Sequence, residues 1–236
     1  MIFIRFEALY CIFMRVHSII LEMSGCYPEQ GFRPESSTQL DLSSIDGTSC
    51  YCDASAASEL RSIVSQIPLE AVHWIDSGDY HYLTLFFLER IAEPFALLLL
   101  DHHDDDQPCA FGDDILSCGS WVREARENLP LLKHVCTVKS SSDRIDIPQG
   151  LPVYVSLDKD VMSRDYARTD WDQGEMTLAE VKAVIASTSG THRVIGIDIC
   201  GEISSAKGAC AEDVDINLRT NLELDDFFVN LHVLIN

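Results

Sequence analysis

The sequence has few basic residues, and this scarcity excludes whole classes of partner. Lys and Arg number 17 against 38 Asp and Glu, which gives a formal net charge of −21 over 236 residues. Nucleic-acid binding requires clustered Lys and Arg to neutralise phosphates, and an anionic membrane surface would repel such a chain. We therefore expect neither a nucleic-acid nor a membrane partner. The same negative field would attract metal ions or a cationic substrate.

Paired-cysteine motifs and uninterrupted apolar runs of membrane-spanning length are also missing. The nine cysteines include no CxxC pair, so neither a zinc ribbon nor a thioredoxin motif is indicated. Arg5, Glu7 and Arg15 interrupt the apolar amino terminus and would be costly inside a bilayer. Reduced cysteines without a transmembrane segment predict a cytoplasmic protein.

Continuous apolar runs alternate with helical patterns along the chain. Runs without polar alternation are typical of parallel strands that are buried on both faces. The expected strands are Val16–Leu21, Ala71–Ile75, Phe95–Leu100, Leu132–Val138, Val153–Leu157 and Val194–Cys200. The expected helices are Ala56–Gln66, Tyr82–Ile91, Trp121–Asn128 and Thr177–Ala186, with another in the tail Val214–Ile235. The alternation predicts a single α/β domain with three α/β/α layers around a mainly parallel sheet.

Polar clusters follow four of the expected strands at the point where each strand ends. They are Ser77–His81, Asp101–Asp105, Ser156–Asp160 and Asp198–Glu202. In an open parallel sheet, ligands bind outside the carboxyl ends of the strands. The four clusters are therefore expected to meet at one edge of the sheet and to form the functional site.

One set of side chains in these clusters has the composition of a binuclear metal site. Alternate residues of an extended chain share a face, so DxHxD and DxD patterns present their ligands together. The set is His81, Asp101, His103, Asp105, Asp158 and Asp160. Four carboxylates balance two divalent cations, and mixed His and carboxylate ligation suits Mn²⁺, Fe²⁺, Co²⁺ or Zn²⁺ rather than Ca²⁺. Two such ions would activate a bridging water as a nucleophile, which implies hydrolysis.

The order of these motifs resembles the arginase–agmatinase (ureohydrolase) family, of which the chain looks like a divergent member. The shared pattern is Gly-x-x-His, then DxHxD, then SxDxD, then a late strand that ends in Asp and Glu. The resemblance implies an arginase/deacetylase-like metallohydrolase domain over residues 16–236, after an N-terminal extension of residues 1–15. It also implies two divalent ions, with Mn²⁺ first among them, bridged by Asp101 and Asp158. One ion would take His81 and Asp105 in addition, and the other would take His103 and Asp160.

The reaction that the resemblance implies is that of a ureohydrolase. A metal-bridging hydroxide would attack a guanidino or amidino carbon, break a C–N bond and release urea. The expected substrate is a cationic guanidino small molecule or an arginine within a peptide, rather than free arginine. The resemblance places the family's guanidinium-binding Glu at Gly201. Glu202 is therefore expected to pair with the cation if the strand bulges there, or Asp198 if it does not. Cys118 is the residue nearest to the place of the family's proton-shuttle histidine.

Departures from the family pattern leave other functions open. Tyr80 interrupts the usual Gly-Gly-Asp-His motif, and no shuttle histidine is found. A DHH-type manganese phosphoesterase would share Asp101-His102-His103 but places a DxD before it. A deacetylase-like amidohydrolase would use one zinc and a tandem His pair, which is missing before Phe95. A catalytically degenerate member that binds metal as an interaction module also stays open, as does a homo-oligomer.

Overall fold

Seven strands form one sheet in which all neighbouring strands run parallel. The computed structural model describes residues 17–109 and 115–231, and the order across its main sheet is β2-β1-β4-β9-β8-β5-β7. The strands are β1 (Ser18–Glu22), β2 (Ser37–Asp41), β4 (Val72–Trp74), β5 (Phe95–Leu100), β7 (Leu132–Val138), β8 (Val153–Asp158) and β9 (Val194–Cys200). Strands β1, β4, β5, β8 and β9 are buried along their whole length, as the continuous apolar runs predict.

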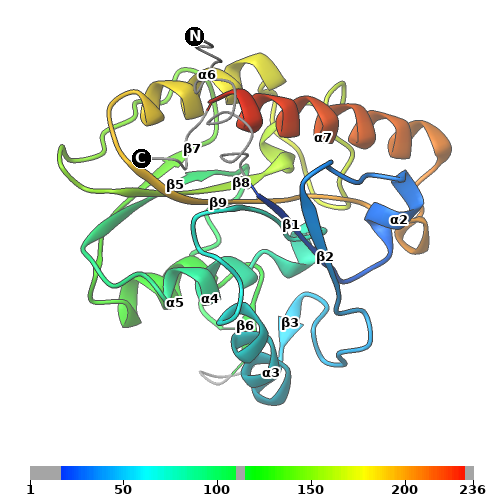
Figure 1. The fold of residues 1–236 in the computed structure, drawn as a ribbon, viewed down its shortest axis with the longest axis horizontal. Helices are drawn as coiled ribbons and strands as arrows, with labels where there is room; N and C mark the ends of the chain where they lie inside the picture. The colour runs from blue at the N-terminus through cyan, green and yellow to red at the C-terminus, as the bar shows by residue number, and fades with distance from the viewer. Residues whose placement is uncertain (1–16, 110–114, 232–236) are drawn as a thin grey trace, which may run out of the picture.

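Helices cover both faces of this sheet and complete three layers (Figure 1). Helices α6 (Leu178–Ser189) and α7 (Ala211–Leu231) lie over one face, and α3 (Ala54–Val64), α4 (Leu83–Leu88) and α5 (Trp121–Asn128) lie over the other. The predicted single α/β/α domain is therefore confirmed. Helix α6 begins at the predicted capping box, in which Thr177 and Glu180 each bond the backbone N–H of the other.

The leucine run of β5 fills both layers of the core. Leu98 and Leu100 pack on the side of α6 and α7, whereas Leu97 and Leu99 pack on the side of α3, α4 and α5. Successive strand residues point to opposite faces, so a central strand needs apolar residues at every position. Each fully buried leucine contributes about 2 kcal/mol by removal from water. This strand therefore holds the acidic residues that follow it at a fixed place.

Several elements have no signal in the sequence pattern. Strand β2 forms an edge of the sheet with mostly exposed residues, so it contains no apolar run. Helix α2 (Cys26–Gln30) is a short turn, and β3 (Tyr51–Cys52) pairs antiparallel with β6 (Leu116–Ser117). The N-terminal extension expected for residues 1–15 lies outside the described residues.

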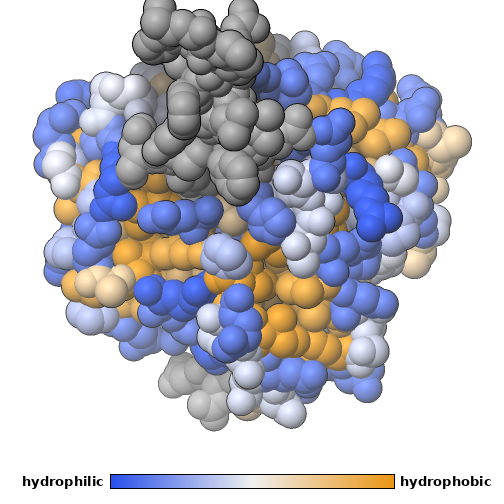
Figure 2. Space-filling model, viewed as in Figure 1, coloured by the Kyte–Doolittle hydropathy of each residue, from blue (hydrophilic) through white to orange (hydrophobic). Residues whose placement is uncertain are grey.

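The described surface carries both hydrophilic and hydrophobic residues. Figure 2 shows hydrophobic residues between hydrophilic ones across the middle of one face. The large hydrophobic side chains that are exposed include Tyr51, Trp171 and Leu222. Within residues 17–109 and 115–231, none of the helices combines the length and the apolar character needed to cross a membrane.

Candidate metal centre

The carboxyl ends of four neighbouring strands, β4, β9, β8 and β5, meet at one edge of the sheet. Asp158 is the last residue of β8, Cys200 is the last residue of β9, and Asp101 directly follows β5. His81 follows the short 3-10 helix η1 (Gly78–Tyr80), which comes after β4. The parallel topology therefore brings together side chains that lie far apart in the sequence, as the position of the polar clusters predicts.

His81 and three carboxylates form the first group of candidate ligands. His81 Nδ1 lies 3.3 Å from Asp101 Oδ2, 3.0 Å from Asp105 Oδ2 and 3.6 Å from Asp158 Oδ2. His81 Nδ1 and Asp101 Oδ2 are buried, and neither atom has a hydrogen-bond partner in the described part of the chain. Such orphaned polar atoms are uncommon in protein interiors, and a cation between them would satisfy both. The residues of this group therefore fit a metal ion.

His103 and Asp160 form a second group that adjoins the first. His103 Nδ1 lies 2.8 Å from Asp160 Oδ2 and 3.7 Å from Asp101 Oδ1. Asp101 thus presents one carboxylate oxygen to each histidine, which is the arrangement that a bridging ligand requires. The second expected bridge, Asp158, faces His81 with Oδ2, while its Oδ1 accepts the N–H of Asp160 at 2.9 Å. The six expected ligands are brought together, and metal binding by them stays a prediction.

Asp105 is held in place by contacts from α5. Its backbone has a φ of 49°, in the left-handed region that costs a non-glycine residue about 1 kcal/mol. The Trp121 indole donates to Asp105 Oδ2 at 2.6 Å, and the N–H of Val122 donates to the Asp105 carbonyl at 3.1 Å. The Trp121 ring also packs against the His81 ring, with 4.8 Å between centroids. These contacts hold the Asp105 carboxylate next to His81 despite the strained backbone.

A hydrogen-bond chain behind His81 fixes its tautomer. The Ser156 hydroxyl donates to Asp198 Oδ1 at 2.6 Å and lies 2.9 Å from His81 Nε2. Because an ionised Asp198 can only accept, the hydroxyl proton goes to Asp198 and the hydroxyl oxygen accepts from His81 Nε2. Nδ1 then faces the carboxylates and would be the ligand atom once a metal ion takes the place of a proton there.

The buried carboxylates carry negative charge at a high energetic cost. Burial, with the charge of Asp160 in second place, raises the pKa of Asp158 to about 7. Burial and the charge of Asp105 raise the pKa of Asp101 well above its usual range. The hydrogen bond to Asp160 raises the pKa of His103 to about 9. Divalent cations would favour the ionised carboxylates and would remove this cost.

The structure corrects the place expected for Glu202. Its carboxylate is completely buried and forms an ion pair with Lys159. It also accepts from Gln30 at 2.6 Å and from Asn221 at 2.7 Å. Both oxygens are therefore engaged within the protein, and the part of the cavity lining that the structure describes does not include Glu202. A direct pairing of Glu202 with a substrate cation does not fit this arrangement.

Asp198 and Cys118, the other two expected catalytic residues, lie at different depths. Asp198 is completely buried behind Ser156, so it orients His81 and does not face a substrate. Cys118 lines the cavity in front of the carboxylates. Burial, with Asp105 in second place, raises the pKa of the Cys118 thiol. A thiol of raised pKa transfers protons poorly near neutral pH, so Cys118 has the position of a shuttle but not its acidity.

A cavity of about 560 Å³ opens in front of the two ligand groups. Its lining includes Asp101, His103, Asp104, Asp105, Asp158 and Asp160, together with Tyr51, Cys118, Lys139 and Trp171. Lys139 pairs with Asp104 at 2.9 Å, so the lining has a strong negative excess. The Trp171 indole is anchored at 3.3 Å to Asp79 Oδ1.

Three residues that the sequence analysis did not assign complete this region. Ser156 links His81 to Asp198, and Trp171 lines the cavity although the segment around it carries no motif. Cys200 Sγ lies 3.1 Å from Asp158 Oδ2. The signal for Cys200 is its place as the last residue of a predicted strand whose end meets the site.

Comparisons with known proteins agree on the fold. No family profile matches the chain. A Thermotoga maritima protein described only as uncharacterized is 28% identical over 233 residues, which covers 92% of each chain. Among solved structures, proclavaminate amidino hydrolase from Streptomyces clavuligerus is similar with a TM-score of 0.65, 18% identity and 93% coverage of both chains.

Two further structures have the same architecture. Arginase from Medicago truncatula has a TM-score of 0.64 and 11% identity, with 92% of this chain and 87% of that chain covered. A Trypanosoma cruzi formiminoglutamase with Mn²⁺ has a TM-score of 0.60 and 12% identity, with 92% of this chain and 93% of that chain covered. The chain therefore has the fold of the arginase (ureohydrolase) family.

Proposed function

We propose that the protein is a binuclear metal-dependent hydrolase that cleaves a C–N bond of a cationic guanidino or amidino substrate and releases urea. The observation that carries this proposal is the pair of adjoining ligand groups that share Asp101. His81 faces one oxygen of this carboxylate and His103 faces the other. When bound, two divalent ions would lower the pKa of a water between them and provide a nucleophile at neutral pH.

The residues of the chain position the parts of this reaction. Ser156 and Asp198 hold the His81 ring with Nδ1 toward the carboxylates. Trp121 covers the His81 ring and fixes Asp105 from the side of α5, which keeps water away from that side. Rigid ligands of this kind keep the site in one geometry before the substrate arrives.

The loaded centre would favour a cationic substrate over an anionic one. Four of the five aspartates that line the cavity would be balanced by two divalent ions, and Asp104 is paired with Lys139, so the hydroxide between the ions would carry the net negative charge. Trp171 and Tyr51 add aromatic faces, each side chain being 41% exposed. A guanidinium over such a face gains a cation–π attraction of about 0.5–2 kcal/mol. With Glu202 paired internally, we infer that the aromatic rings and the metal-bound hydroxide together recognise the cation.

The same features weigh against the alternatives. A phosphoesterase would need basic groups for a phosphate, and the described lining offers only the paired Lys139. A deacetylase-like site would need one ligand group, whereas two groups adjoin here. A metal-binding interaction module remains the second candidate, because Glu202 and Cys118 lack the properties expected of catalytic groups.

The ions, the compartment and the partners belong to the same proposal. We propose two divalent ions, with Mn²⁺ first among them, in line with the formiminoglutamase whose structure holds Mn²⁺. The eight cysteines of the described ranges are all free thiols, which supports a reducing cytoplasm. The excess of acidic residues supports the absence of nucleic-acid and membrane partners. A homo-oligomer is compatible with all of these points.

The test is metal analysis and urea release by the full chain after chelation and reconstitution with Mn²⁺. The panel contains free arginine, an alkylguanidine without an α-carboxyl group, a peptide arginine, a formimino amino acid and a phosphodiester. We expect two bound ions and urea from the alkylguanidine or the peptide, but little from free arginine. Asp101→Asn should lose both ions and all turnover. Asp46→Asn, which removes an exposed carboxylate outside the described cavity lining, should lose neither.

The outcomes separate the candidates. Hydrolysis of the phosphodiester alone would establish the phosphoesterase reaction instead. A single bound ion that survives Asp160→Asn would favour the deacetylase-like reaction. Two bound ions without turnover of any compound would support the interaction module.

A further inference from the structure

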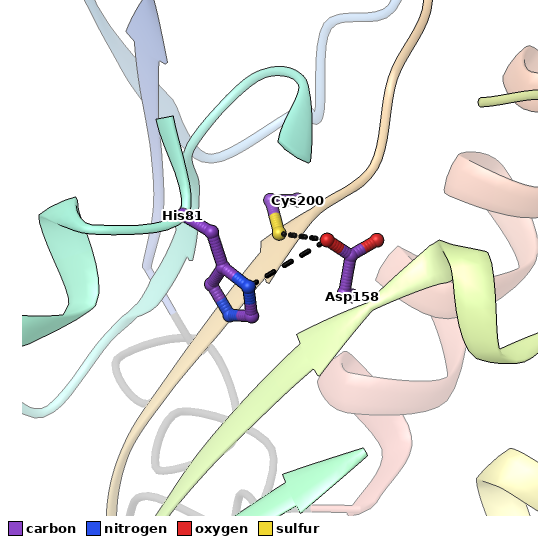
Figure 3. Close-up of side chains that lie close together, drawn as sticks. All are labelled: His81, Asp158 and Cys200. Atoms are coloured by element: carbon purple, nitrogen blue, oxygen red, sulfur yellow. Dashed lines mark hydrogen bonds and ion pairs between the residues drawn. The ribbon is translucent and has the colours of Figure 1, made fainter. Parts of the chain in front are cut away.

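Cys200 brings a sulfur atom to the metal centre. Its side chain is completely buried, and Sγ lies 3.1 Å from Asp158 Oδ2. The same carboxylate oxygen lies 3.6 Å from His81 Nδ1. Figure 3 shows the imidazole, the carboxylate and the thiol pointing toward one another from three separate segments of the chain. The three ligand atoms all lie within 4.8 Å of one another.

We propose that Cys200 is a thiolate ligand of the metal ion beside His81, and that this sulfur makes that one site prefer Zn²⁺ or Co²⁺ over Mn²⁺, whereas the site beside His103 keeps the preference for Mn²⁺. The inference rests on the proposed metal centre but goes beyond its His and Asp ligands. Thiolate is a soft ligand that selects Zn²⁺ and related ions, whereas sites of carboxylate and water suit Mn²⁺. The centre would then consist of one site with N, O and S ligands and one with N and O only.

The strand register explains why the thiol faces the site. Cys200 and Asp158 are register partners on the adjacent parallel strands β9 and β8. Paired residues on neighbouring strands point to the same face of the sheet, so the two side chains leave the strand ends together. The place of Cys200 is therefore fixed by the sheet and does not depend on a mobile loop.

The spacing of the atoms lets one ion contact all three ligands in a site that also includes Asp101 and Asp105. Zn–S bonds of about 2.3 Å and Zn–N or Zn–O bonds of about 2.0–2.1 Å, at angles between about 90° and 110°, give ligand separations of roughly 2.9–3.6 Å. The two measured separations from Asp158 Oδ2 are 3.1 Å to sulfur and 3.6 Å to His81 Nδ1. The buried His81 Nδ1 has no hydrogen-bond partner in the part of the chain that the structure describes, so it is available to an ion in the same space.

Among the described residues, the other buried thiols lack a neighbouring histidine ligand: Cys26 adjoins the carboxylates of Glu22 and Asp76 alone, and the two remaining ones have backbone contacts. Cys136 Sγ lies 3.9 Å from the carbonyl of Arg144, and Cys52 Sγ lies 3.8 Å from the carbonyl of Asp53. Both are weak contacts to neutral backbone groups. Cys200 instead lies close to a carboxylate that shares its group with a histidine. On metal binding its S–H bond would break, the proton would pass to solvent, and the sulfur electron pair would form the metal–sulfur bond.

The first test uses wild-type protein loaded with Zn²⁺, so it needs no variant. X-ray absorption at the zinc edge should show a sulfur scatterer at about 2.3 Å in addition to N and O scatterers at about 2.0–2.1 Å. Zinc surrounded by N and O alone would overturn the proposal. That result would leave the proposed function intact, because two ions would still be bound. Failure to bind any ion would contradict both.

A second test compares variants by spectroscopy. The Co²⁺-loaded protein should show a sulfur-to-cobalt charge-transfer band in the near ultraviolet, which Cys200→Ser should lose. Cys136→Ser is the matched control, because it removes a buried thiol that lies outside the cluster, and it should keep the band. Competition with a chelator should show that Cys200→Ser lowers the ratio of Zn²⁺ to Mn²⁺ affinity by about tenfold or more. An unchanged ratio and an unchanged spectrum would mean that Cys200 only donates a hydrogen bond to Asp158.

Discussion

Replacing Asp158 with Asn should stabilise the metal-free protein above neutral pH while it weakens metal binding. Burial, followed by the charge of Asp160, raises the pKa of Asp158 from 3.8 to about 7. When the pKa of a carboxyl is higher in the folded state than in the unfolded state, the folded protein loses stability as the pH rises between the two values. The loss therefore starts near pH 4 and is complete above about pH 7. Asparagine keeps the shape of the side chain but cannot ionise.

The magnitude follows from the two pKa values. The difference between 3.8 and about 7 corresponds to about 4 kcal/mol in the free energy of unfolding. This is an upper limit, because Asp158 shares its charge with neighbours in one cluster. The asparagine oxygen can still accept the N–H of Asp160, which Asp158 Oδ1 accepts at 2.9 Å. Its amide can donate to His81 Nδ1, and the buried Cys200 thiol, which donates to Oδ2 in the wild type, loses only a weak hydrogen bond.

The assay is urea unfolding in the presence of a chelator at about pH 5 and about pH 8. The free energy of unfolding of Asp158→Asn should exceed that of the wild type by about 2–4 kcal/mol at the higher pH. The difference should be smaller at the lower pH. Asp104→Asn controls for the removal of one charge from an acidic chain and should show a much smaller gain. Addition of Mn²⁺ should reverse the order, because wild type gains binding energy that the variant lacks. A variant that is less stable than wild type at about pH 8 without metal would refute the reasoning.

Two more predictions concern side chains that support the centre. Ser156→Ala removes the acceptor of the His81 Nε2 proton and should weaken metal binding about 10–100-fold. Competition with a chelating dye measures this affinity, and an unchanged value would show that the hydrogen bond does not orient the ring. Lys159→Met leaves the Glu202 carboxylate buried without its cation and should cost about 3–5 kcal/mol in urea unfolding, with metal content unchanged. The loss should be smaller when Glu202→Gln is added, and an equal loss would argue against a coupled pair.

Much of the fold follows from the sequence because the apolar runs are continuous. Strands β5, β7 and β9 and helix α5 have the predicted bounds. The edge strand β2 could not be found in this way, because its side chains are largely exposed and its stability comes from backbone pairing with β1. Hydropathy patterns indicate which segments are buried, and an edge strand has few buried side chains.

The places of the candidate metal ligands were predictable because strand ends fix them. Asp101 and His103 follow a buried strand at alternate positions, so both their location and their direction can be read from the chain. The partners of Glu202 could not be read in the same way. Lys159, Gln30 and Asn221 lie in three different parts of the sequence and meet only in the folded protein. No local pattern records such a pairing.

The position of Glu202 away from the cavity follows from the glycine that precedes it. Gly201 has a φ of 91°, and a Cβ at this position would lie 2.5 Å from Asp158 Oδ1 and 2.7 Å from the N of Lys159. No side chain fits there, so the carboxylate that the family resemblance places at this position cannot be present in this backbone. The next residue, Glu202, instead pairs with Lys159.

The side chain that β9 contributes to the centre is then Cys200, one position earlier. This placement bears on both the proposed metal site and the proposed substrate recognition. A thiol adjoins Asp158, one of the three carboxylates that face His81, and the strand presents no carboxylate to the described lining of the cavity. The cation must then be recognised by groups that line the cavity, and the aromatic face of Trp171 beside the aspartates provides such a surface. Substrate preference should therefore depend more on Trp171 than on Glu202.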